Sequence, residues 1–418
     1  MLTAVLDDDP TGTQAASDVS VVLDLSPAAI REAFDASSSV YLQTNSRALA
    51  RDQAVELCTR LREELDAIAR HKAEPMTVVL RGDSTLRGHV FSESEVFLTP
   101  ESLMVFVPAF PAGGRTTHEG IHYVEIEGRR IPAAETEFAA DPVFGFRNSD
   151  LLGYVRDKGA RQGHLLGLDL VRGPEAALVE ALLALPAGDV ALPDAESDAD
   201  IARLAQAIKV AAQHRRLVIR SAATLAAQLA GVASRGLLER PVPIGPGGVV
   251  IVCGSHTHAA AQQIAALSRY GIHSLVIETA AALADPGAAA AAVIGQARDD
   301  LRRQGLTVIT SDPHRAAEHN TLTHGSQVMS ALTQATRGLL DDVDTVITKG
   351  GITSAEITSQ GVGANTAHVL GQVAAGISVW RTTGADGRKR HNVIVPGNVG
   401  GPGTLVDVLE AIGRLPAG

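Results

Sequence analysis

Short runs of valine, isoleucine and leucine recur along the whole 418-residue chain, and amphipathic stretches separate them. Runs such as 2–6, 76–81, 249–254 and 345–348 are continuously apolar, which is typical of strands buried on both faces of a sheet. Over 48–70, apolar residues recur at spacings of three and four, which predicts a helix. The alternation of such runs and helices predicts an α/β fold with mostly parallel sheets.

The same pattern places the other elements. Further strands are expected at 19–25, 40–44, 103–108, 165–170, 217–220, 274–278, 306–310, 377–380 and 392–396, and further helices at 199–213, 258–270, 287–304, 325–340 and 404–414. Residues 239–248 hold three prolines and three glycines directly before a strand, which is typical of a linker. We therefore expect two α/β domains, 1–240 and 241–418.

Composition excludes several classes of protein. The two cysteines, Cys58 and Cys253, lie far apart, which excludes a disulfide framework and a cysteine zinc site and favours a reduced cytoplasm. A net charge of −11 argues against a nucleic-acid partner. We expect no membrane span, because no uncharged apolar run reaches about 18 residues. The first ten residues lack the basic region of a signal peptide.

Ligands of open α/β sheets bind beyond the carboxyl ends of the strands, so the residues after each predicted strand are candidates for a site. The run 2–6 is followed by the three aspartates 7–9 and a turn with Thr11 and Gly12. Three adjacent carboxylates can be buried only where cations or hydrogen bonds compensate them. We favour such a site over the alternative, a solvent-exposed acidic turn.

Three more strand ends in the first part carry arginine, hydroxyl and glycine residues. Ser46 and Arg47 follow one strand, the loop 81–89 follows another, and Arg115 follows a third. Arginine binds carboxylate or phosphate through two parallel hydrogen bonds, and aspartate and serine can bind hydroxyls. Together these loops could recognise a small polyhydroxylated carboxylate. The alternative for 81–89 is a surface loop with an internal arginine–aspartate pair.

Three glycine-rich turns follow strands in the second part, at 254–257, 349–353 and 396–403. Glycine lets the backbone approach a ligand closely, and helix N-termini favour anions, so the three turns together suggest a polyphosphate site. None is a Walker A motif. Lys349, which precedes its glycines, fits a phosphate contact and a solvent-exposed lysine equally well. The spacing of His314, His319 and His324 favours a polar loop over a metal site.

The motifs at these strand ends resemble the four-carbon acid sugar kinases, the 3-oxo-tetronate, threonate and erythronate kinase group. The family's opening DDxTG is similar to Asp8–Gly12, and its DSTLRG loop to Asp83–Gly88. Its SR and GRT elements are similar to Ser46-Arg47 and Arg115-Thr116. Three more matches follow in the second part in the family's order, at Gly254-Ser255, Gly350–Thr353 and Gly397–Gly400.

The resemblance implies an N-terminal acid-sugar-binding domain at 1–240, a C-terminal nucleotide-binding domain at 241–418, and an active site in the cleft between them. It implies that the acid sugar is bound by Thr11, Gly12, Ser46, Arg47, Asp83, Ser84, Arg87, Gly88 and Arg115. It implies that ATP is bound by Ser255, Gly350, Gly351, Ile352, Thr353, Gly397, Asn398 and Gly400. The expected partners are therefore a small acid sugar and ATP. A homodimer is compatible with the sequence.

Phosphoryl transfer to a hydroxyl needs in-line positioning, charge neutralisation and a proton acceptor. Asp8 and Asp9 are the candidates for that base, and the sequence does not choose between them. Mg²⁺ would arrive with ATP, with Asp8 or Asp9 as a contact, because it prefers oxygen ligands. No site for a metal bound by the protein alone is expected.

Two other functions also fit parts of the sequence. A strand followed by DDDPT is typical of the nucleophile loop of haloacid-dehalogenase-like sugar phosphatases, with Asp7 as nucleophile and Asp9 as acid. That assignment leaves the three glycine-rich turns unexplained. A non-catalytic cytoplasmic sugar-acid sensor would bind the ligand without turnover.

Overall fold

The computed structural model describes residues 2–312, 322–397 and 399–416. The chain divides into two compact units. Unit 1 comprises residues 1–19 and 25–233, and unit 2 comprises residues 20–24 and 234–418. The division thus falls seven residues before the predicted boundary at 240, and the early segment 20–24 belongs to the later unit, which a linear division of the sequence cannot express.

Unit 1 is built on a parallel sheet. Its strand order is β3 (Ser39–Gln43), β1 (Leu2–Asp7), β4 (Met76–Arg81), β11 (Leu217–Ser221), β5 (Leu103–Val107), β10 (Val190–Pro193) and β9 (Gly163–Leu166). All neighbouring strands run parallel. Every residue of β1 and β5 is buried, as their continuous apolar sequences predict.

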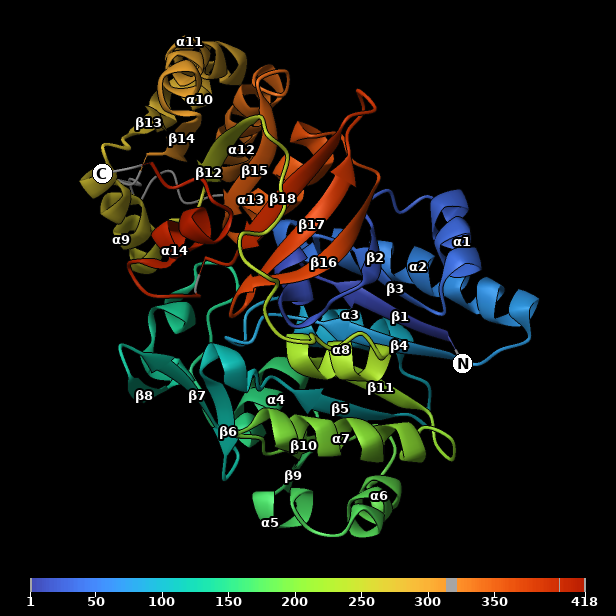
Figure 1. The fold of residues 1–418 in the computed structure, drawn as a ribbon. Coiled ribbons are helices and arrows are strands. Elements are labelled where there is room, and N and C mark those ends of the chain that lie inside the picture. The colour runs from blue at the N-terminus through green and yellow to red at the C-terminus, as the bar shows by residue number, and fades with distance from the viewer. Residues whose placement is uncertain (1, 313–321, 398, 417–418) are drawn as a thin grey trace. The chain divides into compact units, whose positions relative to one another are not determined.

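Helices connect and cover these strands. They are α1 (Pro27–Ala36), α2 (Arg51–Lys72), α3 (Val90–Phe97), α4 (Leu151–Gly159), α5 (Leu168–Val171), α6 (Glu175–Ala184), α7 (Asp198–Ala211) and α8 (Ala223–Ala230). Figure 1 shows α7 and α8 in front of β5 and β11. A separate antiparallel sheet contains β6 (Arg115–His118), β7 (Ile121–Ile126) and β8 (Arg129–Pro132).

The strand order of unit 1 reverses direction beside β1. The chain goes from β1 to β3 on one side of it and returns to β4 on the other. Such a switch point leaves a crevice at the carboxyl ends of the two strands, where ligands of open α/β sheets bind. Asp7 and Arg81, the last residues of β1 and β4, are partners in the strand register. The aspartate-rich turn and the 81–89 loop therefore start at the same place.

Unit 2 is built on a mixed sheet. Its order is β13 (Ser274–Ile277), β14 (Leu306–Ser311), β12 (Gly248–Cys253), β15 (Val343–Lys349), β18 (Lys389–Val395), β17 (Ile377–Thr383), β16 (Thr366–Ala374) and β2 (Val19–Val22). The five strands from β13 to β18 are parallel, whereas β18, β17 and β16 pair antiparallel. A second switch point lies between β12 and β15, because the chain leaves β12 toward β13 and later returns to β15.

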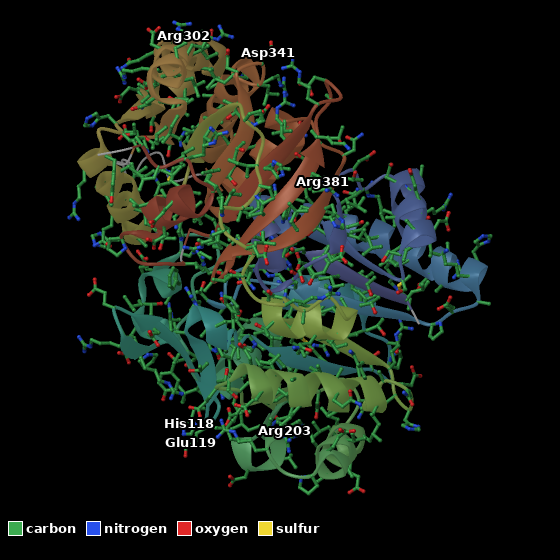
Figure 2. All side chains as sticks on the ribbon, in the orientation of Figure 1. His118, Glu119, Arg203, Arg302, Asp341 and Arg381 are labelled. Carbon is green, nitrogen blue, oxygen red and sulfur yellow. The ribbon has the colours of Figure 1, made fainter. Side chains whose placement is uncertain are left out.

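Strand β12 shows how a continuously apolar run serves two cores. Val249 and Ile251 contribute to one apolar cluster, and Val250 and Val252 contribute to another. The helices of unit 2 are α9 (His258–Ala266), α10 (Thr279–Ala284), α11 (Pro286–Gln304), α12 (Leu322–Gly338), α13 (Gly351–Glu356) and α14 (Thr404–Ala411). Figure 2 labels Arg302 near the end of α11 and Asp341 after α12, both of which are largely exposed.

The strand predicted at 165–170 is wrong in its second half. The strand ends at Leu166, and α5 begins at Leu168 after Gly167. The sequence also failed to predict β6, β7, β8, β10 and β16. Strand β16 alternates between buried and half-exposed residues, so its sequence has no continuous apolar run. Strands β6 and β8 have only four residues each, which is too short for such a run to stand out. No helix in the described ranges is both long enough and apolar enough to span a membrane.

Candidate functional site

Three buried carboxylates meet one guanidinium at the switch point of unit 1. Asp7, Asp8 and Asp9 expose 0%, 2% and 1% of their surface, so the solvent-exposed acidic turn is ruled out. Arg81 Nη1 lies 3.0 Å from Asp7 Oδ1, 3.3 Å from Asp8 Oδ1 and 3.0 Å from Asp9 Oδ1. Arg81 is itself 2% exposed and supplies the compensating cation that the burial of three carboxylates requires.

Asp9 is the most fully engaged of the three aspartates. It is the N-cap of the short 3-10 helix η1 (Pro10–Ala15), and its Oδ1 accepts hydrogen bonds from the Thr11 amide at 2.7 Å and from the Thr11 hydroxyl. Its Oδ2 forms an ion pair with Arg47. Arg81 Nη2 also donates to Thr11 Oγ1 at 2.9 Å. Asp9 therefore organises the loop and binds Arg47.

Gly12 is required by the position of Asp7. A Cβ atom at Gly12 would lie 2.1 Å from Asp7 Oδ2, so only glycine lets η1 fold back onto this carboxylate. Burial raises the pKa of Asp7 to about 7, against the opposing effect of Arg81. The turn η1 packs directly on the Asp7 carboxylate at Gly12, so in this structure a substrate phosphate cannot approach that oxygen. This burial argues against the phosphatase assignment, in which Asp7 would be the nucleophile.

The raised pKa of Asp7 predicts a pH dependence of stability. The native state favours protonated Asp7, so this contribution is fully present below pH 3.8 and is lost as the pH rises to about 7. The free energy of unfolding of the wild type should therefore fall relative to that of Asp7→Asn across this window, by at most about 1.4 kcal/mol per pH unit. Urea unfolding at a series of pH values measures the difference. Parallel curves for the two proteins would contradict the assignment, and the exposed Asp66→Asn serves as the control.

Asp83 joins two arginines in the loop after β4. Arg87 Nε donates to Asp83 Oδ2 at 2.7 Å, and Arg47 Nη1 lies 3.4 Å from the same oxygen. Burial opposes ionisation of Asp83, but Arg87 and Arg47 outweigh it and hold its pKa well below the usual range. The guanidinium of Arg87 lies 5.0 Å from the ring centroid of Phe138. The internal arginine–aspartate pair is thus present, and the binding of a substrate carboxylate by Arg87 stays a prediction.

The other predicted sugar-binding residues are also buried near these loops. Ser46 exposes 1% and Ser84 exposes 4% of its surface. The Ser84 carbonyl lies 2.8 Å from His122 Nε2, and burial lowers the pKa of His122 to about 4, so this imidazole is neutral at pH 7. Arg115 donates to the Gly113 carbonyl, and burial lowers its pKa to about 10. Gly88 has φ +111°, and a Cβ there would lie 3.3 Å from Asp8 Oδ2.

Sequence reasoning missed Arg220 and Glu93. Arg220, on β11, is 1% exposed and forms a buried ion pair with Glu93 Oε2 from α3. Its Nη2 lies 3.9 Å from Asp8 Oδ2, and a Cβ at Gly82 would lie 2.5 Å from the same nitrogen. The position of Arg220 at the carboxyl end of the predicted strand 217–220 could have identified it as a site residue.

The Oδ2 atoms of all three aspartates are buried without a hydrogen-bond partner among the described residues, and they differ in what lies beside them. Asp8 Oδ2 accepts no hydrogen bond from any residue that the structure describes, although it is buried beside Gly88 and Arg220. Asp9 is committed to the η1 cap and Arg47, and Asp7 is covered by Gly12. Asp8 therefore carries the carboxylate oxygen best placed to accept a proton from a ligand hydroxyl.

In unit 2 the three glycine-rich turns leave the sheet side by side. Cys253 and Lys349 are register partners, and Lys349 is the partner of Val395, so the three strands end in one row. A Cβ at Gly397 would lie 2.9 Å from Ser255 Oγ, and one at Gly350 would lie 3.2 Å from Ser255 Cβ. The fold thus brings the turns together, as predicted.

The remaining predicted nucleotide-binding residues lie in the same turns. Gly350 has φ +113° and caps α13, which begins at Gly351. Thr353 is buried, whereas Ile352 is 37% exposed. Gly400, with φ +87°, lies against Thr404 at the start of α14. Asn398, His314 and His319 lie outside the described residues, and His324 lies in α12.

Lys349 matches neither of the two predicted roles. Its side chain is fully buried, and its Nζ donates to the carbonyls of Pro396 at 2.6 Å and Val399 at 3.3 Å. It is therefore not a solvated lysine, and in this structure its donors are directed at the protein backbone. Among the residues described, no cluster of three histidine, cysteine, aspartate or glutamate side chains is arranged to hold a metal ion.

Comparison with known protein families matches both halves of the chain. Residues 3–229 match the family model described as a sugar-binding N-terminal domain, and residues 250–405 match the model described as a nucleotide-binding C-terminal domain. The first match contains the carboxylate–arginine cluster, and the second contains all three glycine-rich turns.

Two relatives carry named activities. A D-threonate kinase of Bordetella bronchiseptica is 35% identical over 248 residues, which are 58% of this chain and 54% of that protein. A D-erythronate kinase of Heliobacterium modesticaldum is 32% identical over 146 residues, covering 34% of this chain and 31% of that protein. The chain thus aligns with about half the length, or less, of the curated relatives that it matches.

Two solved structures share the fold. A Salmonella typhimurium protein solved under the name of a tRNA synthase has a TM-score of 0.70 at 18% identity, covering 97% of this chain and 98% of that one. A Haemophilus influenzae protein has a TM-score of 0.64 at 16% identity, covering 98% of this chain and 100% of that one. At these identities the likeness describes the fold alone.

Proposed function

The chain belongs to the four-carbon acid sugar kinase family, and from this membership we propose that it transfers the γ-phosphoryl group of ATP to a hydroxyl of a small acid sugar. The observation that carries the proposal is the buried cluster at the switch point of unit 1. Three aspartates there share Arg81, and each keeps its Oδ2 without a hydrogen-bond partner among the described residues.

We assign recognition of the acid sugar to the arginine-rich loops of unit 1. Arg47, Arg87 and Arg115 come from three different strand ends and supply cationic donors for a carboxylate. Asp83 and Ser84 supply oxygens for hydroxyl groups. Asp83 is ionised throughout the neutral range because of its two arginines, so it acts as a hydrogen-bond acceptor there.

We assign the role of general base to Asp8. A base must reach the proton that it removes, and of the three unbonded Oδ2 atoms that of Asp9 pairs with Arg47 and that of Asp7 lies against Gly12, which leaves Asp8 Oδ2 for a ligand. Arg220, 3.9 Å away, would stabilise the ionised carboxylate in its buried position. Asp9 then positions the loop, and Asp7 sets the packing of η1. This proposal chooses Asp8 from the two candidates, Asp8 and Asp9, that the sequence offers.

We assign ATP to the three turns of unit 2. Phosphoryl transfer relies on positioning and charge stabilisation, and turns built from glycine offer backbone amides to phosphate oxygens. Mg²⁺, which neutralises phosphate charge, would enter with ATP.

The relatives suggest which acids to test. Their names are D-threonate kinase and D-erythronate kinase, so tetronates and 3-oxo-tetronates are the proposed substrate class. Release of ADP should be followed with ATP, Mg²⁺ and a panel of four-carbon acid sugars, with five- and six-carbon acids as controls. We expect acid-dependent release with at least one four-carbon acid. Turnover of sugar phosphates without ATP would favour a phosphatase, and binding without turnover would favour a sensor.

Gly397→Val should separate nucleotide binding from acid binding. A side chain at this position would enter the space between Ser255 and the Gly350 turn, so the KM for ATP should rise by about tenfold or more, equivalent to about 1.4 kcal/mol. The KM for the acid should stay within about twofold. Gly295→Val is the matched control, because a Cβ at Gly295 meets nothing within 4 Å. Equal losses for both substrates would contradict the assignment of this turn to ATP.

A further inference from the structure

The described residues at the start of the third glycine-rich turn, 396, 397, 399 and 400, include three whose carbonyl groups are bound by side chains of the protein. Lys349 Nζ donates to the carbonyls of Pro396 at 2.6 Å and Val399 at 3.3 Å. Thr257 Oγ1 donates to the Gly397 carbonyl at 2.7 Å, and Gln263 Nε2 donates to the Val399 carbonyl at 3.1 Å. Three carbonyls of one short turn are thus held by side chains from β15 and the α9 region.

This arrangement fixes the direction of the peptide groups. In a planar trans peptide the N–H points opposite to the carbonyl of the preceding residue. When the carbonyls of Pro396 and Val399 are held by Lys349, the amides of Gly397 and Gly400 point away from Lys349. Amides that point in one direction are the donors that bind phosphate oxygens in glycine-rich turns.

Burying the charged ammonium group of Lys349 at this position costs desolvation free energy. Its side chain is fully buried at the end of β15, and burial lowers its pKa to about 8. Among the described groups, the titratable side chain acting on it is the thiol of Cys253 on β12, and burial raises the pKa of that thiol, which stays neutral. Val395 on β18 is apolar, and the turn contributes only carbonyls. A buried ammonium group that is paired only with carbonyls is unfavourable for stability, which suggests that its hydrogen bonds to the turn serve the function of the turn.

We propose that Lys349 is a positioning residue that orients the turn 396–400 so that its amides bind the phosphates of the nucleotide. This inference rests on the proposed function, because it takes unit 2 as the nucleotide-binding unit. The ammonium also adds a positive charge beneath the turn at neutral pH, where the lysine is mostly protonated. Lys349 acts through the backbone and does not contact the phosphate.

The test measures ADP binding by calorimetry on the full chain. Lys349→Met keeps the length of the side chain and removes both donors and charge, so the Kd for ADP should rise by about tenfold or more at pH 7. Affinity for the acid sugar should change by less than about twofold. Lys389→Met, at an exposed position on β18, is the matched control and should bind ADP normally. An unchanged Kd in a folded Lys349→Met would overturn the proposal.

Two further measurements guard against a variant that fails to fold. Gln263→Leu removes a second anchor of the same turn and should also weaken ADP, by a smaller factor. In the wild type, affinity for ADP should fall between pH 7 and pH 9 as Lys349 loses its proton, whereas the acid sugar should bind unchanged. A flat pH profile for ADP, together with normal binding by Gln263→Leu, would overturn the role of Lys349. Wild-type protein that binds no ADP would instead overturn the proposed function itself.

Discussion

Replacing Arg81 by methionine is expected to destabilise unit 1 by about 3–5 kcal/mol or more, the range for breaking a buried ion pair by removing one partner. Arg81 Nη1 lies within 3.3 Å of three buried carboxylates, so its loss leaves Asp7, Asp8 and Asp9 without their shared cation. The expected result is a large fall in the urea midpoint or a failure to accumulate folded protein. Urea unfolding of the variant against the wild type measures it.

A second substitution should partly restore the Arg81→Met variant. Burial raises the pKa of Asp7 to about 7, and losing Arg81 would raise it further, so above pH 7 Asp7→Asn removes a carboxyl that resists ionisation and the double variant should be more stable than Arg81→Met alone. The exposed Arg70→Met on α2 is the control for loss of an arginine. An Arg81→Met protein as stable as the wild type would refute the account of the cluster.

Asp8→Asn is expected to lower kcat for phosphoryl transfer by about 10²–10⁴-fold, the range attributed to general base catalysis. Asparagine keeps the shape of the side chain but cannot accept the proton of the substrate hydroxyl. The KM for ATP should stay close to that of the wild type, since the nucleotide is assigned to the turns of unit 2. Initial rates at saturating ATP and acid provide kcat.

Two comparisons make this result specific. Asp66→Asn, at a half-exposed position on α2, should leave kcat unchanged. Asp9→Asn should reduce stability along with activity, because Asp9 caps η1 and binds Arg47. If Asp8→Asn retained near-normal kcat while Asp9→Asn lost it without loss of stability, the base would be Asp9.

The sequence predicted which loops form the candidate site, because ligands of open α/β sheets bind beyond the carboxyl ends of the strands. The predicted strands ending near Asp7, Arg81, Cys253 and Lys349 are present, and each pair flanks a switch point of its sheet. A continuous apolar run identifies a strand that is buried on both faces, and parallel strands end at one edge. The residues after those runs therefore had to lie near one another.

The pairing of the charges could not be predicted in the same way. Arg81 compensates the aspartates because its position on β4 is in register with Asp7, and register depends on long-range pairing rather than on local sequence. For the same reason the Arg220–Glu93 pair, separated by more than a hundred residues, left no local signal of contact. The hydrogen bonds from Lys349 to the carbonyls of Pro396 and Val399 likewise join residues about fifty positions apart and leave no local signal.

The most direct test of the central claim is the fate of the γ-phosphate, followed by phosphorus NMR with ATP, Mg²⁺ and the best acid from the panel. We predict one equivalent of a new phosphomonoester on the acid sugar for each ADP formed, with no inorganic phosphate, and no reaction when the acid is omitted. Inorganic phosphate released from ATP without the acid, or from an acid sugar phosphate without ATP, would contradict the assignment of an acid sugar kinase.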